Sequence, residues 1–125
     1  MIIELDFSSD KPIYTQLYEA IILAMASGEI VSGEPLPSVR NLATEIGINL
    51  HTVNKAYSQL KDEGYIIMDR RKGAIIGDIP IKDDSNNKST LETDLNLILS
   101  KAKLLGYEEK YLTNIINEFY RKVGH

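Results

Sequence analysis

Residues 36–65 read LPSVRNLATEIGINLHTVNKAYSQLKDEGY, and the spacing of the apolar residues in this stretch decides the fold. Ser38 is a suitable N-cap, because its hydroxyl can accept a hydrogen bond from a free backbone N–H group. A helix is therefore expected over residues 38–46, ending at Gly47. Its apolar residues recur at i, i+3, i+4 and i+7, the repeat of a helix with one buried face: Val39, Leu42, Ala43 and Ile46.

A second helix is expected after a break of about four residues around Gly47, with Asn49 as its N-cap and its end near Glu63. Two short amphipathic helices separated by a tight glycine turn fit the helix-turn-helix geometry. The apolar residues of the second helix have the same spacing as those of the first: Val53, Ala56, Tyr57 and Leu60.

The outward face of the second helix is polar and can donate hydrogen bonds. Such a face suits the major groove of DNA, where base edges and phosphates offer acceptors. Taken alone, this face is better explained as an ordinary solvated surface. The residues on this face are His51, Thr52, Asn54, Lys55, Ser58 and Gln59.

The segment that follows predicts a β-hairpin, or wing. Two short β-prone runs, residues 65–68 and 74–76, flank the polar turn of residues 69–73. The turn carries Arg70, Arg71 and Lys72, and three cations beside a polar helix can contact phosphates and an adjacent minor groove. A solvated turn accounts for any one of these cations, but the whole arrangement favours DNA binding.

These residues resemble the winged-helix domain of GntR-type bacterial transcription regulators over about residues 10–77. The resemblance rests on an ordered series of motifs: Pro-x-Tyr-x-Gln at 12–16, Gly-x-x-Leu-Pro-Ser-x-Arg at 33–40, Leu-Ala at 42–43, Thr-Val at 52–53, Ala-Tyr at 56–57, Leu60 and Glu-Gly at 63–64. It implies that Arg40, the exposed start of the second helix and the wing glycine contact operator DNA.

The pattern and the resemblance together define the candidate DNA-binding residues. Leu50 departs from the family, which often has Arg or Pro there, and Arg71-Lys72-Gly73 keeps only the second glycine of a Gly-x-Gly wing. The candidates are Ser38, Arg40, Asn49, His51, Thr52, Asn54, Lys55, Arg70, Arg71, Lys72 and Gly73.

Composition limits the other classes of function. The 125-residue chain has a net charge of −4, so its DNA affinity should be modest per subunit and should depend strongly on salt. It has no cysteine and two histidines, and we expect neither a metal site nor a cofactor. There is no catalytic triad, no glycine-rich phosphate loop and no pair of carboxylates in apolar surroundings, so an enzyme is not expected. Without a membrane span or signal peptide, the chain is expected in the cytoplasm.

The N-terminal segment is expected to support the helix-turn-helix. Alternation of Ile3, Leu5 and Phe7 with acidic residues suggests a short strand, and Ser8-Ser9-Asp10 suggests the start of a helix that ends before Gly28. Tyr14 and Tyr18 of this helix are interpreted as packing residues, because they belong to an apolar stripe at helical spacing.

Two further helices are expected after a polar linker at residues 79–89. The first covers residues 90–105, with Ser89 and Glu92 as a capping box, and the second covers residues 108–122. Two helices of this length cannot enclose a core alone, so their apolar faces need a partner surface. Those faces comprise Leu91, Leu95, Ile98, Leu99, Ala102, Leu112, Ile115, Ile116 and Phe119.

The partner of these faces is either the chain's own winged domain or a second copy. We favour a homodimer, because helix-turn-helix proteins commonly bind half-sites about 34 Å apart as two-fold dimers. The resemblance agrees, since YtrA-like members of the family dimerise through a two-helix extension and typically repress operons of ABC-type transporters. So short an extension leaves no room for a ligand-binding domain, and whether a small-molecule effector exists is unknown.

The sequence therefore predicts an α+β, mostly α chain with three parts. Residues 1–78 form a winged helix-turn-helix domain, residues 79–89 a linker and residues 90–125 a two-helix dimerisation extension. The predicted function is a homodimeric transcription regulator, expected to be a repressor, that binds double-stranded operator DNA. A winged-helix module that binds another protein and no DNA is the alternative.

Overall fold

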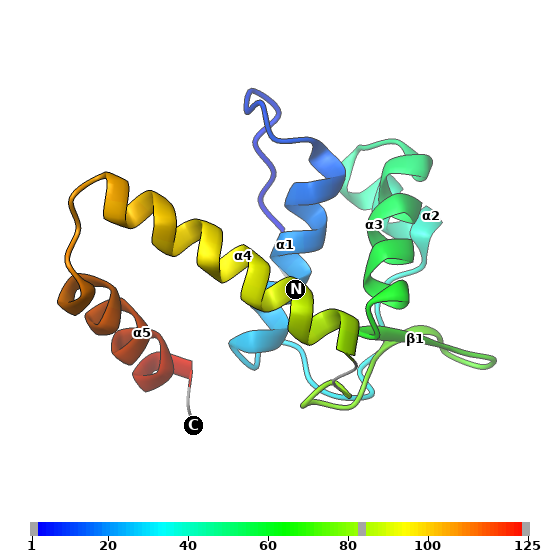
Figure 1. Cartoon of the computed structure of the whole chain (residues 1–125). Coiled ribbons are helices and arrows are strands. Elements are labelled where there is room, and N and C mark those ends of the chain that lie inside the picture. Colours follow the sequence, from blue (N-terminus) through cyan, green and yellow to red (C-terminus); the bar gives the residue numbers. More distant parts are fainter. Residues whose placement is uncertain (1–2, 83–84, 124–125) are drawn as a thin grey trace. The chain divides into compact units, whose positions relative to one another are not determined.

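The computed structural model describes residues 3–82 and 85–123, which divide into two compact units, with the boundary in the sequence after Lys82. The first unit holds helix α1 (Ile13–Ala26), helices α2 (Val39–Ile46) and α3 (Leu50–Asp62), and strands β1 (Ile66–Asp69) and β2 (Gly73–Ile76). The second unit holds helices α4 (Ser85–Leu104) and α5 (Glu109–Val123). Figure 1 labels these elements except β2, and each unit is described by itself.

The helix-turn-helix forms where the sequence predicts it, and local hydrogen bonds fix both of its helices. The Ser38 hydroxyl accepts from the Asn41 backbone N–H at 3.0 Å, and the Asn49 side chain accepts from the His51 N–H at 2.7 Å. Gly47 ends α2 with a left-handed φ of 75°, a conformation that glycine adopts at little cost. Both predicted N-caps and the glycine C-cap are confirmed.

A single apolar core holds the first unit together. Both α1 and α2 pack against α3, and α3 in turn packs against β1 (Figure 1). This packing buries the apolar stripes that the sequence predicts and so turns the remaining face of α3 outward. The largest fully buried side chains come from α1, α3, both strands and the α1–α2 connection: Leu17, Ile21, Ile30, Val53, Leu60, Ile66 and Ile76.

The wing is an antiparallel hairpin in which Ile66 pairs with Ile76 and Asp69 with Gly73. Sequence reasoning missed a third segment that pairs with β2. The Gly33 N–H donates to the Ile76 carbonyl at 2.8 Å, and the Leu36 N–H donates to the Ala74 carbonyl at 2.8 Å. The α1–α2 connection thereby joins the base of the wing to the start of α2.

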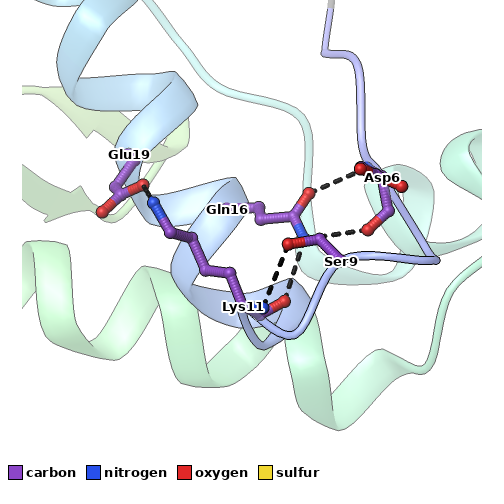
Figure 2. Close-up of polar contacts among 5 residues, drawn as sticks. All are labelled: Asp6, Ser9, Lys11, Gln16 and Glu19. Atoms are coloured by element: carbon purple, nitrogen blue, oxygen red, sulfur yellow. Dashed lines mark hydrogen bonds and ion pairs between the residues drawn. The ribbon is translucent and has the colours of Figure 1, made fainter.

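The N-terminal expectations were wrong in two respects. Residues 3–7 form no strand, and α1 begins at Ile13 and not near Ser8. The side chains that looked like a helix start are used in a turn, where Asp6 accepts from the N–H and hydroxyl of Ser8. Figure 2 shows how Gln16 holds this turn on α1: it accepts from the Asp6 N–H and donates to the Asp6 and Lys11 carbonyls.

The expected boundaries between the units also need correction. The winged-helix unit extends to Lys82 and not to residue 78, because Ile81 packs against the core. Most of the expected linker is not a linker, since α4 begins at Ser85, within residues 79–89. Ser89 is therefore inside the helix, where its carbonyl accepts from the Thr93 hydroxyl, and it caps nothing. Residues 83 and 84, also assigned to the linker, lie outside the described residues.

The second unit leaves nearly all of its large apolar side chains in contact with solvent. Leu91 is 68% exposed, Ile98 57%, Ile115 50% and Phe119 45%. Ala102 is a correction to the candidate dimerisation face, because it is buried within the chain and offers a partner little surface. Leu112 is half-buried, whereas Leu95, Leu99 and Ile116 are exposed.

Candidate nucleic-acid interface

The outward face of α3 is polar and accessible. His51, Asn54, Lys55 and Ser58 are exposed, whereas Thr52 is half-buried. Val53, Ala56, Tyr57 and Leu60 hold the opposite face in the core. The helix thus presents two turns of hydrogen-bonding side chains on a rigid support, which is the arrangement that groove recognition requires.

The start of α2 lies beside this face and is fixed by a tyrosine that sequence reasoning treated only as core. The buried Tyr57 hydroxyl donates to the Pro37 carbonyl at 2.7 Å, and burial raises the pKa of this phenol, so it stays a donor. The bond joins α3 to the residue that precedes the Ser38 N-cap. Arg40, in the first turn of α2, is exposed and has no ion-pair partner among the described residues.

The wing tip is a compact turn whose three cations face solvent. The Asp69 carboxylate accepts from the backbone N–H groups of Arg71 at 2.8 Å and Lys72 at 3.0 Å. These two hydrogen bonds hold the pKa of Asp69 below its ordinary value. Gly73 completes the turn with φ 77°, and Arg70, Arg71 and Lys72 are all exposed.

A concavity of about 310 Å³ brings three of the predicted residues together. Ser38 reaches it from the N-terminus of α2, Asn54 from α3 and Gly73 from the wing. Seven residues absent from the candidate DNA-binding set also line it, and most of them are apolar: Val39, Tyr57, Ser58, Lys61, Ile66, Met68 and Ala74. The hollow is largely apolar, but Ser38, Asn54, Ser58 and Lys61 add hydroxyl, amide and ammonium groups that can contact a phosphate backbone.

Two of the predicted residues already make contacts within the chain: the cap at Asn49, which the sequence predicts, and a contact of Lys55, which it does not. The side-chain oxygen of Asn49 is occupied as the cap of α3, so only its amide donors are free for a ligand. Lys55 lies away from the concavity, against α1, where its Nζ is 3.9 Å from the centroid of the Tyr14 ring. The contact between Lys55 and Tyr14 could not be anticipated from local sequence signals, although Pro-x-Tyr-x-Gln marks Tyr14 as part of a motif.

A polar contact between α1 and α3 fixes the C-terminal end of α3, where the chain turns into the wing. The Tyr18 hydroxyl donates to Glu63, which also accepts from the Gln59 amide at 3.1 Å. Burial and the neighbouring Glu63 carboxylate raise the pKa of Tyr18, so the phenol remains a donor. This contact helps to hold the base of the wing at a defined angle to α3.

We also searched the described residues for a metal site and for a membrane-spanning helix. Residues 3–82 and 85–123 contain no group of three or more side chains that could hold a metal ion. None of the described helices is long and apolar enough to cross a membrane.

A helix-turn-helix followed by a two-stranded wing, with polar side chains outward on the second helix, defines a winged helix-turn-helix protein. The family model for bacterial regulatory proteins of the gntR family matches residues 13–76, which is about half of the chain. The chain belongs to the GntR family of transcription regulators.

Individual relatives agree with this assignment. The chain is 36% identical over 110 residues to the HTH-type transcriptional repressor YtrA of Bacillus subtilis, a match that covers 87% of this chain and 79% of the relative. It is 31% identical over 114 residues to the HTH-type regulator YhcF of the same organism, over 90% and 93% of the two chains.

Solved structures with related folds include a YtrA protein from Sulfolobus acidocaldarius, a GntR-family transcription factor. It has 36% sequence identity and a TM-score of 0.62, over 78% of this chain and 99% of that one. A transcriptional antiterminator from Listeria monocytogenes EGD-e has 25% identity and a TM-score of 0.86, over 98% and 92% of the two chains. The chain is thus a YtrA-like GntR regulator and not an enzyme.

Proposed function

We propose that this regulator recognises operator DNA with α3 in the major groove and the wing tip against the neighbouring phosphates and minor groove. The observation that carries the proposal is one accessible surface, formed by the exposed face of α3, the start of α2 and the cationic wing. Because base edges and phosphates are mainly acceptors in such contacts, a surface rich in donors is complementary to them.

The residues of this surface fall into two groups, those expected to contact bases and those expected to contact phosphates. His51, Thr52 and Asn54 lie on the first turns of α3, the part of a recognition helix that contacts bases, and the amide of an asparagine can pair with adenine. Ser38 and Arg40 at the start of α2, together with Arg70, Arg71 and Lys72, supply phosphate contacts. Those contacts fix the register of the protein without reading sequence.

The net charge of −4 does not oppose this assignment, because most acidic groups lie outside the proposed surface, and the carboxylate of Asp69 in the wing accepts hydrogen bonds from backbone N–H groups. Glu19 is paired with Lys11 on α1, and Asp69 is turned toward the backbone of its own wing. The cations of the proposed surface remain exposed. We therefore expect binding that weakens steeply as salt is raised.

We further propose that the protein acts as a homodimer joined by its second unit. The large apolar side chains of α4 and α5 are exposed in a single chain, and contiguous apolar surface of this kind marks an association site. Two-fold pairing would place two α3 helices on half-sites about 34 Å apart. Dimerisation also compensates for modest affinity per subunit.

Repression is the regulatory outcome we propose, because the similar protein from Bacillus subtilis is named a repressor. By the resemblance to YtrA-like regulators, the regulated genes are expected to include an ABC-type transporter operon, and the protein is expected to act in the cytoplasm. Deletion of the gene should raise the transcript level of its target operon. An unchanged or lower level would exclude repression.

The direct test is selection of duplexes from a random pool, followed by titration of the best one with wild-type protein and Arg40→Ala. The variant should bind about tenfold or more weakly, since it loses a charge-assisted contact. The matched control is Lys88→Ala, which removes an exposed cation from α4. Failure of the wild-type protein to retain any duplex would contradict DNA recognition and favour a protein-binding winged helix.

A further inference from the structure

Lys55 of α3 is held by an uncharged group from another helix. Its Nζ lies 3.9 Å from the centre of the Tyr14 ring, which belongs to the first turn of α1. No carboxylate within the described ranges forms an ion pair with Lys55. The ring is half-buried and packed by α1, whereas the lysine is exposed. The flexible side chain of Lys55 therefore contacts a tyrosine ring that is itself held in place.

The chemical nature of the Tyr14 ring determines which contacts the Lys55 ammonium can still make. A carboxylate partner would hold the ammonium equally well but would cancel its charge and occupy its donors. The face of a tyrosine ring attracts the cation through its quadrupole and leaves the full positive charge in place. A lysine oriented in this way remains available to a phosphate.

Holding Lys55 in one orientation favours binding, because an exposed lysine has many rotamers and binding must restrict them. Lysine loses more side-chain entropy on ordering than most residues do. A side chain already confined in the free protein loses less of that entropy when it binds, which strengthens the complex without any new contact to the ligand.

We propose that Tyr14 is a positioning residue for DNA recognition, which pre-orders Lys55 for a contact with a backbone phosphate beside α3. The proposal rests on the proposed function, in which the outward face of α3 meets DNA. It assigns to α1 a part in recognition, although Tyr14 itself touches no base. Tyr14 was interpreted from sequence as a packing residue, and this second role depends on the position of Lys55.

The experiment uses the full chain, a selected duplex and the variants Tyr14→Leu, Tyr14→Phe, Lys55→Ala and Tyr14→Leu/Lys55→Ala. Tyr14→Leu should weaken binding by about two- to fivefold, the equivalent of an exposed cation–π contact. Tyr14→Phe should bind like wild type, because it keeps the ring. In the Lys55→Ala background, Tyr14→Leu should have no further effect.

Salt titration separates the loss of a phosphate contact by Lys55 from the loss of its orientation by Tyr14. Lys55→Ala should lower the slope of log K against log salt by about one, because a phosphate contact is lost. Tyr14→Leu should leave that slope unchanged, because the charge remains. In the free protein, the Lys55 side-chain protons should show an upfield ring-current shift in NMR spectra of wild type and Tyr14→Phe but not of Tyr14→Leu.

Two outcomes would overturn the role of Tyr14: wild-type affinity in Tyr14→Leu, or an equal loss with and without Lys55, which would indicate a purely structural effect. Arg40→Ala in the same titrations tests the proposed function separately. If Arg40→Ala weakens binding and Tyr14→Leu does not, only the role of Tyr14 fails. If neither weakens binding, both proposals fail.

Discussion

Tyr57 links the core of the molecule to its proposed binding surface. Its ring is buried between α3 and the rest of the first unit, while its hydroxyl reaches the carbonyl of Pro37, just before the capped start of α2. One residue thus contributes apolar packing and fixes the place where Ser38 and Arg40 are presented. The sequence predicts the first role through the i, i+3, i+4 repeat but gives no sign of the second.

Replacing Tyr57 with phenylalanine should separate these two roles. The variant keeps the ring but removes the hydrogen bond to the Pro37 carbonyl, which should lower the free energy of unfolding by about 0.5–1.5 kcal/mol. Urea denaturation followed by circular dichroism measures this change. Tyr120→Phe, at an exposed position of α5, is the control and should unfold like wild type. Equal stability of Tyr57→Phe and Tyr120→Phe would contradict the account.

At the scale of elements, the sequence predicts helices best where the signals are local. Ser38, Gly47 and Asn49 each act within a few residues of their own position, and all three behave as expected. Ser89 and Glu92 mislead because a cap-like pair can also occur inside a helix, and the polar residues before them show no apolar stripe. Sequence-local reasoning therefore set the start of α4 five residues too late.

Contacts between distant segments account for the rest of what the sequence did not reveal. Residues 33–36 read as a loop because they contain Gly33 and Pro35, yet they pair with β2. Gln16 holds the N-terminal turn from ten residues away, and Tyr14 meets Lys55 across two helices. Such pairs depend on tertiary structure, so periodicity and capping rules do not detect them.

The turn of the helix-turn-helix should be sensitive to the backbone conformation of Gly47. A Cβ at this position would meet no atom within 4 Å, so substitution costs only the left-handed φ of 75°. Gly47→Ala should therefore lower the free energy of unfolding by about 1 kcal/mol. Gly47→Asn should cost less, because asparagine tolerates this conformation. Urea unfolding that is unchanged in Gly47→Ala would show that the turn does not need a left-handed residue.

At the scale of the whole molecule, the two units differ in how far they bury their apolar side chains. The first unit encloses a core of its own, whereas α4 and α5 expose Leu95, Ile98, Ile116 and Phe119. The sequence predicts this difference, because two amphipathic helices cannot bury their own faces. It does not identify Ala102 as a residue already covered.

Removal of residues 83–125 should leave a folded monomer, while the full chain should sediment as a dimer. The first unit keeps its whole core in this truncation, so loss of the dimer would not reflect loss of folding. Ile116→Asp should weaken the dimer of the full chain, because it places a charge on the apolar face of α5. Thr113→Asp, which adds the same charge at an exposed polar site, is the control. A truncated chain that remains dimeric would contradict this assignment.

The central claim is that α3 and the cationic wing together face a DNA duplex, and the salt dependence of binding tests it most directly. Changing Arg70, Arg71 and Lys72 to alanine should weaken binding of a selected duplex and lower the slope of log K against log salt by about two to three. The control is the triple alanine variant of Lys88, Lys103 and Lys110, which removes the same charge from the second unit and should keep the wild-type slope. Equal slopes for the wing variant and the control would contradict the claim.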